Sequence, residues 1–452
     1  MSYTATLASY AATLRYQDIP ASAVAAAKRV TLDYLGVTLA AIRYAPGTLI
    51  VEYVRGLGGH PRSTVIGTDL LTSPCQAALA NGTLAADMEQ DDVHPSSNLH
   101  ASSVFHSAAL PVAEVSGADG KAFLAAVVAA YDVGCRVSRA MGDGNQYARG
   151  FHPTAVSGTF GAAAAAGKLL GLDGPGMASA IGLTGCQAAG LLTWEQEQEH
   201  FTKSFQSGVP ARNAVTAAEL ARMGYVGAPD TLDGKYNVFD AFAGQRNFPA
   251  LVADLGSRFE VEHTGYKFYS CCRMTHSTLD AVLSLARQHR FGPSDIDSIT
   301  VWLAETAAPI VDNNDLTTHN LQHVVAAALT DGTVMREQTS AARRQDPALR
   351  ALAGRVTLLS DPALESLYPE HWAARVRIRT TKGAEHQLQL DDPFGTDARP
   401  ASDEEIQAKF RRMAGTVLPA DRVEQLIDTV NRLETLSTIR PLTGLLAVNP
   451  RS

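Results

Sequence analysis

The acidic and histidine side chains best suited to proton transfer are concentrated between residues 81 and 103. This segment reads NGTLAADMEQDDVHPSSNLHASS and supplies six titratable side chains: Asp87, Glu89, Asp91, Asp92, His94 and His100. Neighbouring carboxylates raise one another's pKa and histidine titrates near neutrality, so the group can provide both a proton acceptor and a proton donor. Glu89 and Asp92 are three residues apart and would share one face of a helix. The alternative is a helix end whose acidic groups are only solvated.

A second candidate for proton transfer is His152, in the sequence Gly-Phe-His-Pro-Thr. Pro153 suits the first turn of a helix, and small residues follow it, so we expect a helix over Thr154–Leu170. His152 would then lie at a helix N-terminus, where the local field lowers the pKa of an imidazole and favours anions. The alternative is a capping or buried histidine without a chemical role.

Three cations could hold an acidic substrate. Lys203 lies between Phe201 and Phe205, ahead of a helix expected over Val209–Met223, and is a candidate carboxylate clamp. It could equally pair on a surface with one of three nearby acids: Glu195, Glu197 and Glu199.

The other two cations, Lys267 and Arg273, belong to the segment YKFYSCCRMTH, which ends at His276. Arg273 or His276 at a helix start could bind anions. Cys271 and Cys272 are better explained as buried thiols than as metal ligands, because the second cysteine pair of a structural zinc site is missing. The alternative for this segment is an interface with incidental charges. Together with His100 and His152, the three cations suit a polycarboxylate.

The elements that must position these residues change in character along the chain. Helical periodicity dominates the first half, over Ala21–Ile42, Ser102–Val115, Lys121–Ala140, Thr154–Leu170 and Val209–Met223. Strand patterns follow at Ile296–Leu303, Arg355–Leu359, Ala374–Thr380 and Glu385–Leu390, the last two forming a hairpin around Lys382-Gly383. Helices return at Thr275–His289, Leu321–Leu329, Ser402–Met413 and Ala420–Leu433. We therefore expect a mainly α protein: a large helical domain from both chain ends with an inserted α+β lobe.

Composition narrows the function classes. The chain has 452 residues, 46% hydrophobic and 19% charged, which are the proportions of a globular protein of two or three domains. A net charge of −8 disfavours nucleic acid and anionic membrane as partners. The five scattered cysteines, the absence of a visible signal sequence and the lack of a membrane span favour the cytoplasm. No motif indicates a metal or a cofactor, so we expect neither.

Six segments together resemble the MmgE/PrpD family, which includes 2-methylcitrate dehydratase, cis-aconitate decarboxylase and iminodisuccinate epimerase. They are LDYLGVTLAA (32–41), NGTLAADMEQDDVH (81–94), ADGKAFLAAVVAAYDVGCRVSRAMG (118–142), GFHPTAVSGTFGAAAAAGKLLGLD (150–173), KSFQSGVPARNAVTAAELARMGYVG (203–227) and YKFYSCCRMTHSTLDAVLSL (266–285). The resemblance runs nearly end to end and keeps the family's order.

The resemblance implies a homodimeric, cofactor-free enzyme acting on small di- or tricarboxylates. It implies a helical domain over 1–257 and 401–452 and an α+β lid domain over 258–400. His152, Lys203 and Lys267 fall on active-site positions of the family, and His100 falls on its loop histidine. With Asp91 these form the predicted catalytic set. The predicted substrate-binding residues are Glu89, Asp92, Cys272, Arg273, His276 and His323, the last in place of a lid tyrosine.

Several residues depart from the family pattern; among them, Glu89 replaces an aspartate and Val93 replaces a threonine. Three functions therefore stay open. The first is a lyase that removes a proton next to a carboxylate with loss of water or carbon dioxide. The second is an epimerase or isomerase using the same site, and the third is an inactive dimeric binding homologue. We expect the substitution Lys203→Met to abolish activity and to change the melting temperature by only a few degrees.

Overall fold

The computed structural model describes residues 2–142 and 145–448, and these divide into two compact units. Unit 1 comprises residues 1–192, 202–264 and 402–452, and unit 2 comprises residues 193–201 and 265–401. Both chain ends thus belong to unit 1. Unit 2 begins seven residues later than the insertion boundary predicted at 258, and it includes a short segment, 193–201, that the predicted boundaries left in the helical domain.

Unit 1 is helical apart from one short hairpin, β1 (Ser63–Thr64) and β2 (Leu71–Thr72). Its α-helices are α1 (Tyr3–Thr13), α2 (Ala21–Ala41), α3 (Ala45–Leu57), α4 (Pro74–Asp87), α5 (Ala101–Ser116), α6 (Gly120–Met141), α7 (Asn145–Ala148), α8 (Pro153–Val156), α9 (Gly158–Leu169), α10 (Gly174–Gly185), α11 (Thr202–Arg222), α12 (Val238–Phe242), α19 (Asp403–Ala414), α20 (Ala420–Asn431) and α21 (Arg440–Leu445). Short 3-10 turns connect them, including η1 (Tyr16–Asp18), η2 (Pro95–Ser97), η4 (Phe248–Leu251), η5 (Glu260–His263) and η9 (Leu433–Thr435).

Helix α9 lies at the centre of unit 1. It packs against α5, α6 and α11, and all of its residues except Lys168 are buried. Eight of the 12 residues of α9, GTFGAAAAAGKL, are alanine or glycine, whose small size lets neighbouring helix axes approach closely. The small-residue composition therefore explains how a short helix can be surrounded by three others.

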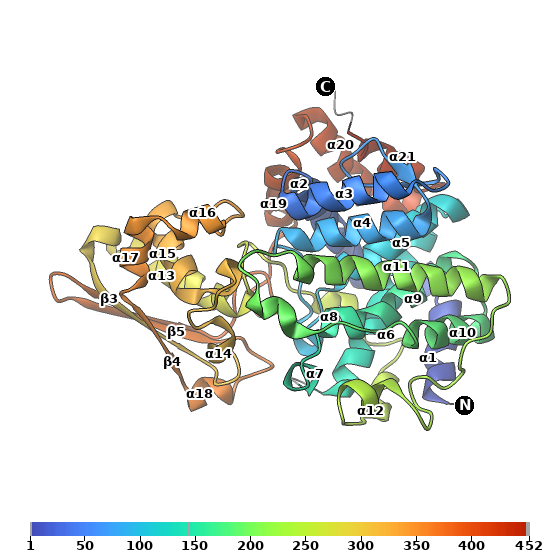
Figure 1. Ribbon diagram of the computed structural model, residues 1–452, viewed down its shortest axis with the longest axis horizontal. Helices are drawn as coiled ribbons and strands as arrows, with labels where there is room; N and C mark the ends of the chain where they lie inside the picture. Colours follow the sequence, from blue (N-terminus) through green and yellow to red (C-terminus); the bar gives the residue numbers. More distant parts are fainter. Residues whose placement is uncertain (1, 143–144, 449–452) are drawn as a thin grey trace. The chain divides into compact units, whose positions relative to one another are not determined.

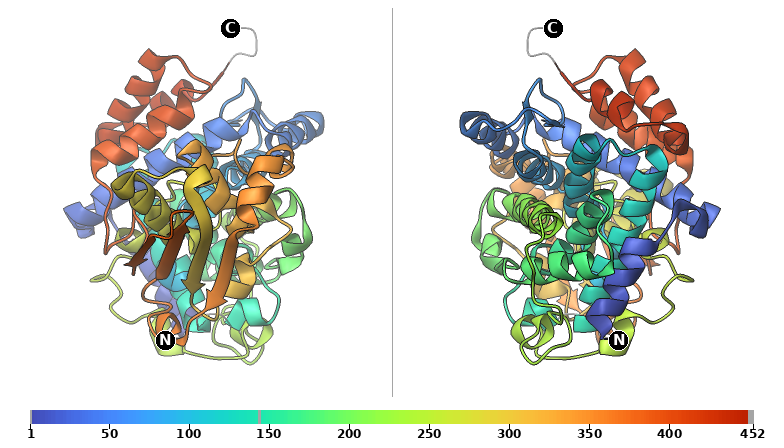
Figure 2. Two further views of the ribbon diagram at one scale, coloured as in Figure 1. Left: turned by 90° about the vertical axis from the view of Figure 1, so that its left-hand side faces the viewer. Right: turned by 90° about the vertical axis from the view of Figure 1, so that its right-hand side faces the viewer.

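Helices from the C-terminal segment of the chain pack against helices from its N-terminal segment within unit 1. Helix α19 packs along α2, and Figure 1 and both views of Figure 2 show these red and blue segments side by side. Ser402 caps α19 and forms the predicted capping box with Glu405. Unit 1 is therefore assembled from residues more than 350 positions apart in the sequence, as Arg29 and Asp403 illustrate with a separation of 374.

Unit 2 is built around a four-stranded mixed sheet in the order β4-β3-β5-β6, visible in the left view of Figure 2. The strands are β3 (Ile296–Leu303), β4 (Val356–Ser360), β5 (Ala374–Thr380) and β6 (Glu385–Leu390). Strand β3 pairs with β4 in parallel and with β5 in antiparallel orientation, and β5 and β6 form the predicted hairpin. Gly383 takes the positive φ of 84° that this turn requires.

Unit 2 has a hydrophobic core of its own, formed by its helices and its sheet. The helices are α13 (His276–His289), α14 (Ala308–Val311), α15 (Leu321–Asp331), α16 (Ala341–Arg344), α17 (Pro347–Ala353) and α18 (Pro362–Glu365), with 3-10 turns η6 (Arg273–Thr275), η7 (Pro293–Asp295) and η8 (Thr317–His319). The turn η3 (Leu192–Gln196) leads into the segment 193–201. Apolar side chains of α13, α15 and the sheet form one buried cluster. The fold class predicted from the sequence, mainly helical with an α+β lobe, is confirmed.

Among the described residues, no single helix has the length and apolar character needed to cross a membrane; the bent pair α2 and α3, which meet at 87°, passes that test only by length and composition.

Candidate active site

The loop between α4 and α5 carries most of the candidate residues of unit 1. Helix α4 ends at Asp87, and Glu89 has a left-handed backbone with a φ of 50°. The prediction that Glu89 and Asp92 share a helical face is therefore wrong, because the helix ends before either residue. A left-handed backbone is unfavourable for a residue with a side chain, by about 1 kcal/mol or more, so surrounding contacts must maintain it.

Glu89 pairs with Lys203 inside the protein. The Lys203 Nζ lies 2.6 Å from Glu89 Oε1 and 2.5 Å from Oε2, and the two side chains are 5% and 2% exposed. The surface pairing considered from the sequence, with Glu195, Glu197 or Glu199, is not the one that forms. A buried ion pair loses most of its hydration, so the two groups are held at a defined place mainly by each other.

Lys203 lies in the first turn of α11, which begins at Thr202 rather than at the predicted Val209. The internal Pro210 and the run of polar residues hid this longer helix from sequence periodicity. Helices α4 and α11 cross in close contact: a Cβ added to Gly82 would lie 2.7 Å from the Gly208 Cα, and one added to Gly208 would lie 2.3 Å from the Leu79 carbonyl oxygen. This contact brings the end of α4, and hence Glu89, close to the start of α11.

Asp91 and His100 form a second pair, with Asp91 Oδ1 3.3 Å from His100 Nδ1. The His100 side chain is 13% exposed, whereas that of Asp91 is buried. The backbone N–H of His100 donates to the Thr154 hydroxyl at 3.0 Å, which ties this loop to the segment that carries His152. A carboxylate beside one ring nitrogen orients an imidazole for proton transfer through the other.

His152 is buried and precedes Pro153 at the start of α8, as predicted, but the helix breaks at Ser157 before α9 begins. Its Nδ1 lies 3.0 Å from Gln206 Oε1, and Gln206 Nε2 donates to the Leu191 carbonyl. This orientation of the amide makes Nδ1 the protonated nitrogen and leaves the lone pair of neutral His152 on Nε2.

The pKa of His152 lies well below its ordinary value, because burial opposes the charged form and because Lys203 and His100 add positive charge nearby. The sequence predicted the direction of this shift but attributed it to the field of a helix N-terminus. The His100 and His152 ring centroids are 6.3 Å apart. At neutral pH, His152 is thus a neutral imidazole beside a histidine–carboxylate pair, an arrangement suited to a general base.

The Asp92 side chain is buried, and both of its carboxylate oxygens accept hydrogen bonds from the protein. Its Oδ1 accepts from the Ser102 N–H at 2.8 Å and its Oδ2 accepts from the Tyr131 hydroxyl at 2.6 Å. Burial raises the pKa of Asp92 to about 7, although the two hydrogen bonds lower it. These contacts anchor the loop to α5 and α6, and a role in substrate binding stays a prediction.

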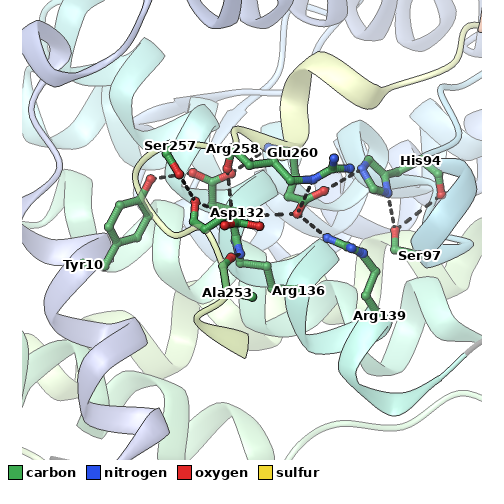
Figure 3. Close-up of polar contacts among 11 residues, drawn as sticks. Tyr10, His94, Ser97, Asp132, Arg136, Arg139, Ala253, Ser257, Arg258 and Glu260 are labelled. Carbon is green, nitrogen blue, oxygen red and sulfur yellow. Dashed lines mark hydrogen bonds and ion pairs between the residues drawn. The ribbon is translucent and has the colours of Figure 1, made fainter. Parts of the chain in front are cut away.

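A buried polar network holds the middle of the same loop (Figure 3). His94 Nε2 lies 3.3 Å from Glu260 Oε2, and Glu260 Oε1 accepts from Arg139 at 2.6 Å. Burial alone would raise the pKa of Glu260, but the hydrogen bond with His94 and the charges of Arg139 and Arg136 outweigh it and hold that pKa well below its usual range. The Glu260 N–H donates in turn to Asp132, which accepts from the Tyr10 hydroxyl. His94 is therefore a structural anchor for the loop.

The remaining candidates lie in unit 2. Lys267 is fully buried, and Cys271 and Cys272 are buried free thiols as predicted. Arg273 donates to the carbonyls of Tyr266 at 2.8 Å and Phe394 at 3.2 Å. Burial lowers the pKa of its guanidinium to about 10.

The two histidines of unit 2 also contact its backbone. His276 Nε2 lies 3.2 Å from the Cys271 carbonyl oxygen, and His323 Nε2 lies 2.7 Å from that of Gln338. The contacts described for Arg273, His276 and His323 are all made to backbone carbonyl oxygens of unit 2. That these residues bind substrate stays a prediction.

Within unit 1, the structure thus brings together five predicted residues: Glu89, Asp91, His100, His152 and Lys203. Sequence reasoning missed the supporting residues Gln206 and Thr154, whose types carry no distinctive signal. Across residues 2–142 and 145–448, no group of three or more His, Cys, Asp or Glu side chains is arranged to hold a metal ion. A surface groove of about 790 Å³ lies over α2, α19 and α20, and none of the candidate residues lines it.

Two family models match this chain. The MmgE/PrpD N-terminal domain matches residues 5–251, and the MmgE/PrpD C-terminal domain matches residues 269–435. The chain belongs to the MmgE/PrpD family.

Similar members of the MmgE/PrpD family bear the names of lyases. A cis-aconitate decarboxylase-like protein, oryM, from Aspergillus oryzae is 29% identical over 98% of this chain and 97% of its own length. The cis-aconitate decarboxylase of Mus musculus is 27% identical over 93% of this chain and 88% of its own length. The 2-methylcitrate dehydratase of Cupriavidus necator is 26% identical over 78% and 77%. The names of these relatives indicate a family of lyases that act on carboxylates.

Proposed function

We propose that this chain is a cofactor-independent lyase that removes a proton from the carbon next to a carboxylate of a small di- or tricarboxylate. The observation that carries the proposal is the neutral, buried His152 beside the Asp91–His100 pair and the Glu89–Lys203 pair. These groups supply a base, a second proton carrier and a cation without further components. The names of the similar MmgE/PrpD proteins, decarboxylases and a dehydratase, support the same reaction class.

In the proposed dehydration, His152 Nε2 accepts the proton next to the carboxylate, and the C–H electron pair forms the carbon–carbon double bond. The C–O bond breaks, and His100 gives a proton to the departing hydroxide, which leaves as water. Lys203 stabilises the negative charge that develops on the carboxylate, while Glu89 holds its ammonium group in place. In a decarboxylation no C–H proton is removed first: the C–C bond to the lost carboxylate breaks, carbon dioxide leaves, and the electron pair that stays on the carbon accepts a proton from His100.

The roles of the unit 2 residues rest on the resemblance. We propose that Lys267 binds a second carboxylate and that Cys272, Arg273, His276 and His323 shape specificity. The homodimer expected from the resemblance also stays a prediction, and light scattering coupled to size-exclusion chromatography would test it.

The deciding experiment is proton NMR of the purified protein in deuterated water with hydroxy-, unsaturated and amino-di- and tricarboxylates. We expect new alkene signals, or the proton signals of a decarboxylated product, for one member of this panel. Incorporation of deuterium into a compound whose carbon skeleton is unchanged would contradict the lyase and indicate an epimerase. Ligand binding without turnover or exchange would indicate an inactive binding homologue. The variant His152→Gln, which keeps a polar side chain but lacks the base, is the matched control and should show no reaction.

A further inference from the structure

A buried lysine from the C-terminal segment reaches the loop that carries Glu89 and Asp91. Lys409 lies on α19 with Ile406, Phe410 and Met413 on the same buried face, and it is 1% exposed. A lysine on the apolar face of a helix loses the hydration of its ammonium group, so its position requires specific partners.

Those partners come from two other segments of unit 1. Lys409 Nζ lies 2.6 Å from Oδ1 of Asp33, a fully buried side chain on α2. It also donates to the Gln90 carbonyl oxygen at 2.7 Å. Close packing of α2 on α19 allows this reach, because a Cβ added to Gly36 would lie only 3.0 Å from the Phe410 ring.

Stability alone does not explain the pair. Burying two charges removes their hydration, and apolar residues of similar shape often give equal or greater stability. Gln90, however, lies between Glu89, whose backbone is left-handed, and Asp91, which pairs with His100. A charged donor on the Gln90 carbonyl fixes the peptide between Gln90 and Asp91, directly after the left-handed Glu89.

We infer that Lys409, held by Asp33, is a positioning residue for the site: it fixes the backbone at Gln90 and thereby directs Glu89 to Lys203 and Asp91 to His100. The expected effect of Lys409 on turnover rests on the proposed function, whereas its expected effect on the loop backbone does not. The C-terminal helix α19 thus contributes to the site through the backbone at Gln90.

The test replaces both charges by apolar residues of matching shape, in the double variant Asp33→Leu with Lys409→Met. We expect a melting temperature only a few degrees below that of the wild type, because both charges of the buried ion pair are removed together. We expect kcat to fall by roughly 10–100-fold, more than KM rises, because small displacements of catalytic groups have effects of this size. Hydrogen exchange followed by mass spectrometry should show about tenfold faster exchange in peptides covering residues 88–93, with α4 and α19 unchanged.

The control is Arg411→Gln with Glu424→Gln, which removes a solvent-exposed ion pair between α19 and α20. It should leave kcat and the exchange of residues 88–93 unchanged. Faster exchange throughout unit 1 of the test variant, with a large fall in melting temperature, would make the pair a general structural element and overturn the inference. Unchanged exchange at residues 88–93 would also overturn it. If no panel compound reacts even with the wild type, the proposed function fails while the exchange measurement still decides the role of Lys409.

Discussion

At the residue scale, the main feature is that the protein pairs the proposed carboxylate-binding cation with its own acid. Glu89 and Lys203 are both buried, and the carboxylate of Glu89 neutralises the charge of Lys203. The sequence had instead suggested that Lys203 is a cation available to bind a carboxylate of the substrate. Removing one member of such a pair leaves the other uncompensated. This changes the stability expected for a variant at Lys203.

We predict that Lys203→Met abolishes turnover and also lowers the melting temperature, because an unpaired buried charge costs about 3–5 kcal/mol. The combined variant Glu89→Gln with Lys203→Met should recover most of the lost melting temperature, since neither charge remains, while staying inactive. Differential scanning calorimetry of both variants tests this. A single variant as stable as the wild type would mean that Glu89 finds another compensating partner.

Asp92 gives a prediction for pH. Its pKa rises from an ordinary value near 3.8 to about 7 in the folded protein, so the folded state holds a proton that the unfolded state has lost. The stabilising contribution of protonated Asp92 is therefore complete below about pH 4 and is lost as the pH rises to 7. Each pKa unit corresponds to about 1.4 kcal/mol, which gives an upper limit of a few kcal/mol.

We therefore expect the melting temperature of Asp92→Asn to rise relative to the wild type between pH 5 and pH 8. The variant cannot ionise, and its amide can still pair with Ser102 and Tyr131. Asp132, whose pKa burial also raises to about 7, acts in the same direction in both proteins and cancels in the comparison. A difference that stays constant with pH would show that Asp92 is ionised at low pH in the folded state.

Residue types singled out His100, His152 and Lys203, and the structure places these three side chains near one another in unit 1, while their roles stay predictions. The sequence did not reveal Lys409 or Asp33, although a signal was available: each is a charged residue on a helix face that is otherwise apolar. Their partnership depends on the packing of α2 against α19, which no local pattern encodes.

At the element scale, the crossing of α4 and α11 positions the Glu89–Lys203 pair. A Cβ at position 208 would lie 2.3 Å from the Leu79 carbonyl oxygen and 2.4 Å from the Thr83 hydroxyl, so the helices would have to separate. We predict that Gly208→Ala costs about 1–3 kcal/mol and lowers turnover. The melting temperature and the rate on the substrate found by NMR are the two measurements.

The control for this prediction is Gly56→Ala in α3, where nothing lies within 4 Å of the added carbon. It should raise the stability by about 0.4–1 kcal/mol, because alanine loses less backbone freedom than glycine on folding. Equal effects of the two substitutions would contradict the importance of the close contact.

Strands were predicted more accurately than helix ends. Three of the four strands of unit 2, β3, β5 and β6, have the predicted bounds, since β-branched residues and a Lys-Gly turn mark them clearly. The start of α11 and the break between α8 and α9 were missed. In both places the chain is rich in small or polar residues, and tertiary contacts rather than periodicity determine where the helices begin and end.

At the scale of the whole molecule, the two units differ in how they depend on the chain ends. Unit 1 needs α19 and α20, whose side chains Ile406, Phe410, Leu426 and Ile427 are buried. Unit 2 has its own core around the sheet.

We predict that a chain ending at Ala401 loses the fold of unit 1 but retains that of unit 2. The deletion leaves Asp33 buried without Lys409 and exposes the apolar face of α2. Limited proteolysis with mass spectrometry should then give a resistant fragment within residues 265–401 and rapid loss of residues 1–264. Survival of α4, α5 and α9 in the digest would contradict this dependence.

The link between Lys409 and the Gln90 carbonyl also has a consequence during protein synthesis. Lys409 joins the growing chain 319 residues after Gln90. At about 5–20 residues per second, the ribosome needs roughly 15–65 s to cover that distance. For most of this interval Asp33 and the loop at residues 88–93 are outside the ribosome without the lysine that binds them. Until α19 and α20 are synthesised, the helical unit is incomplete, and its exposed apolar helix faces can be bound by chaperones.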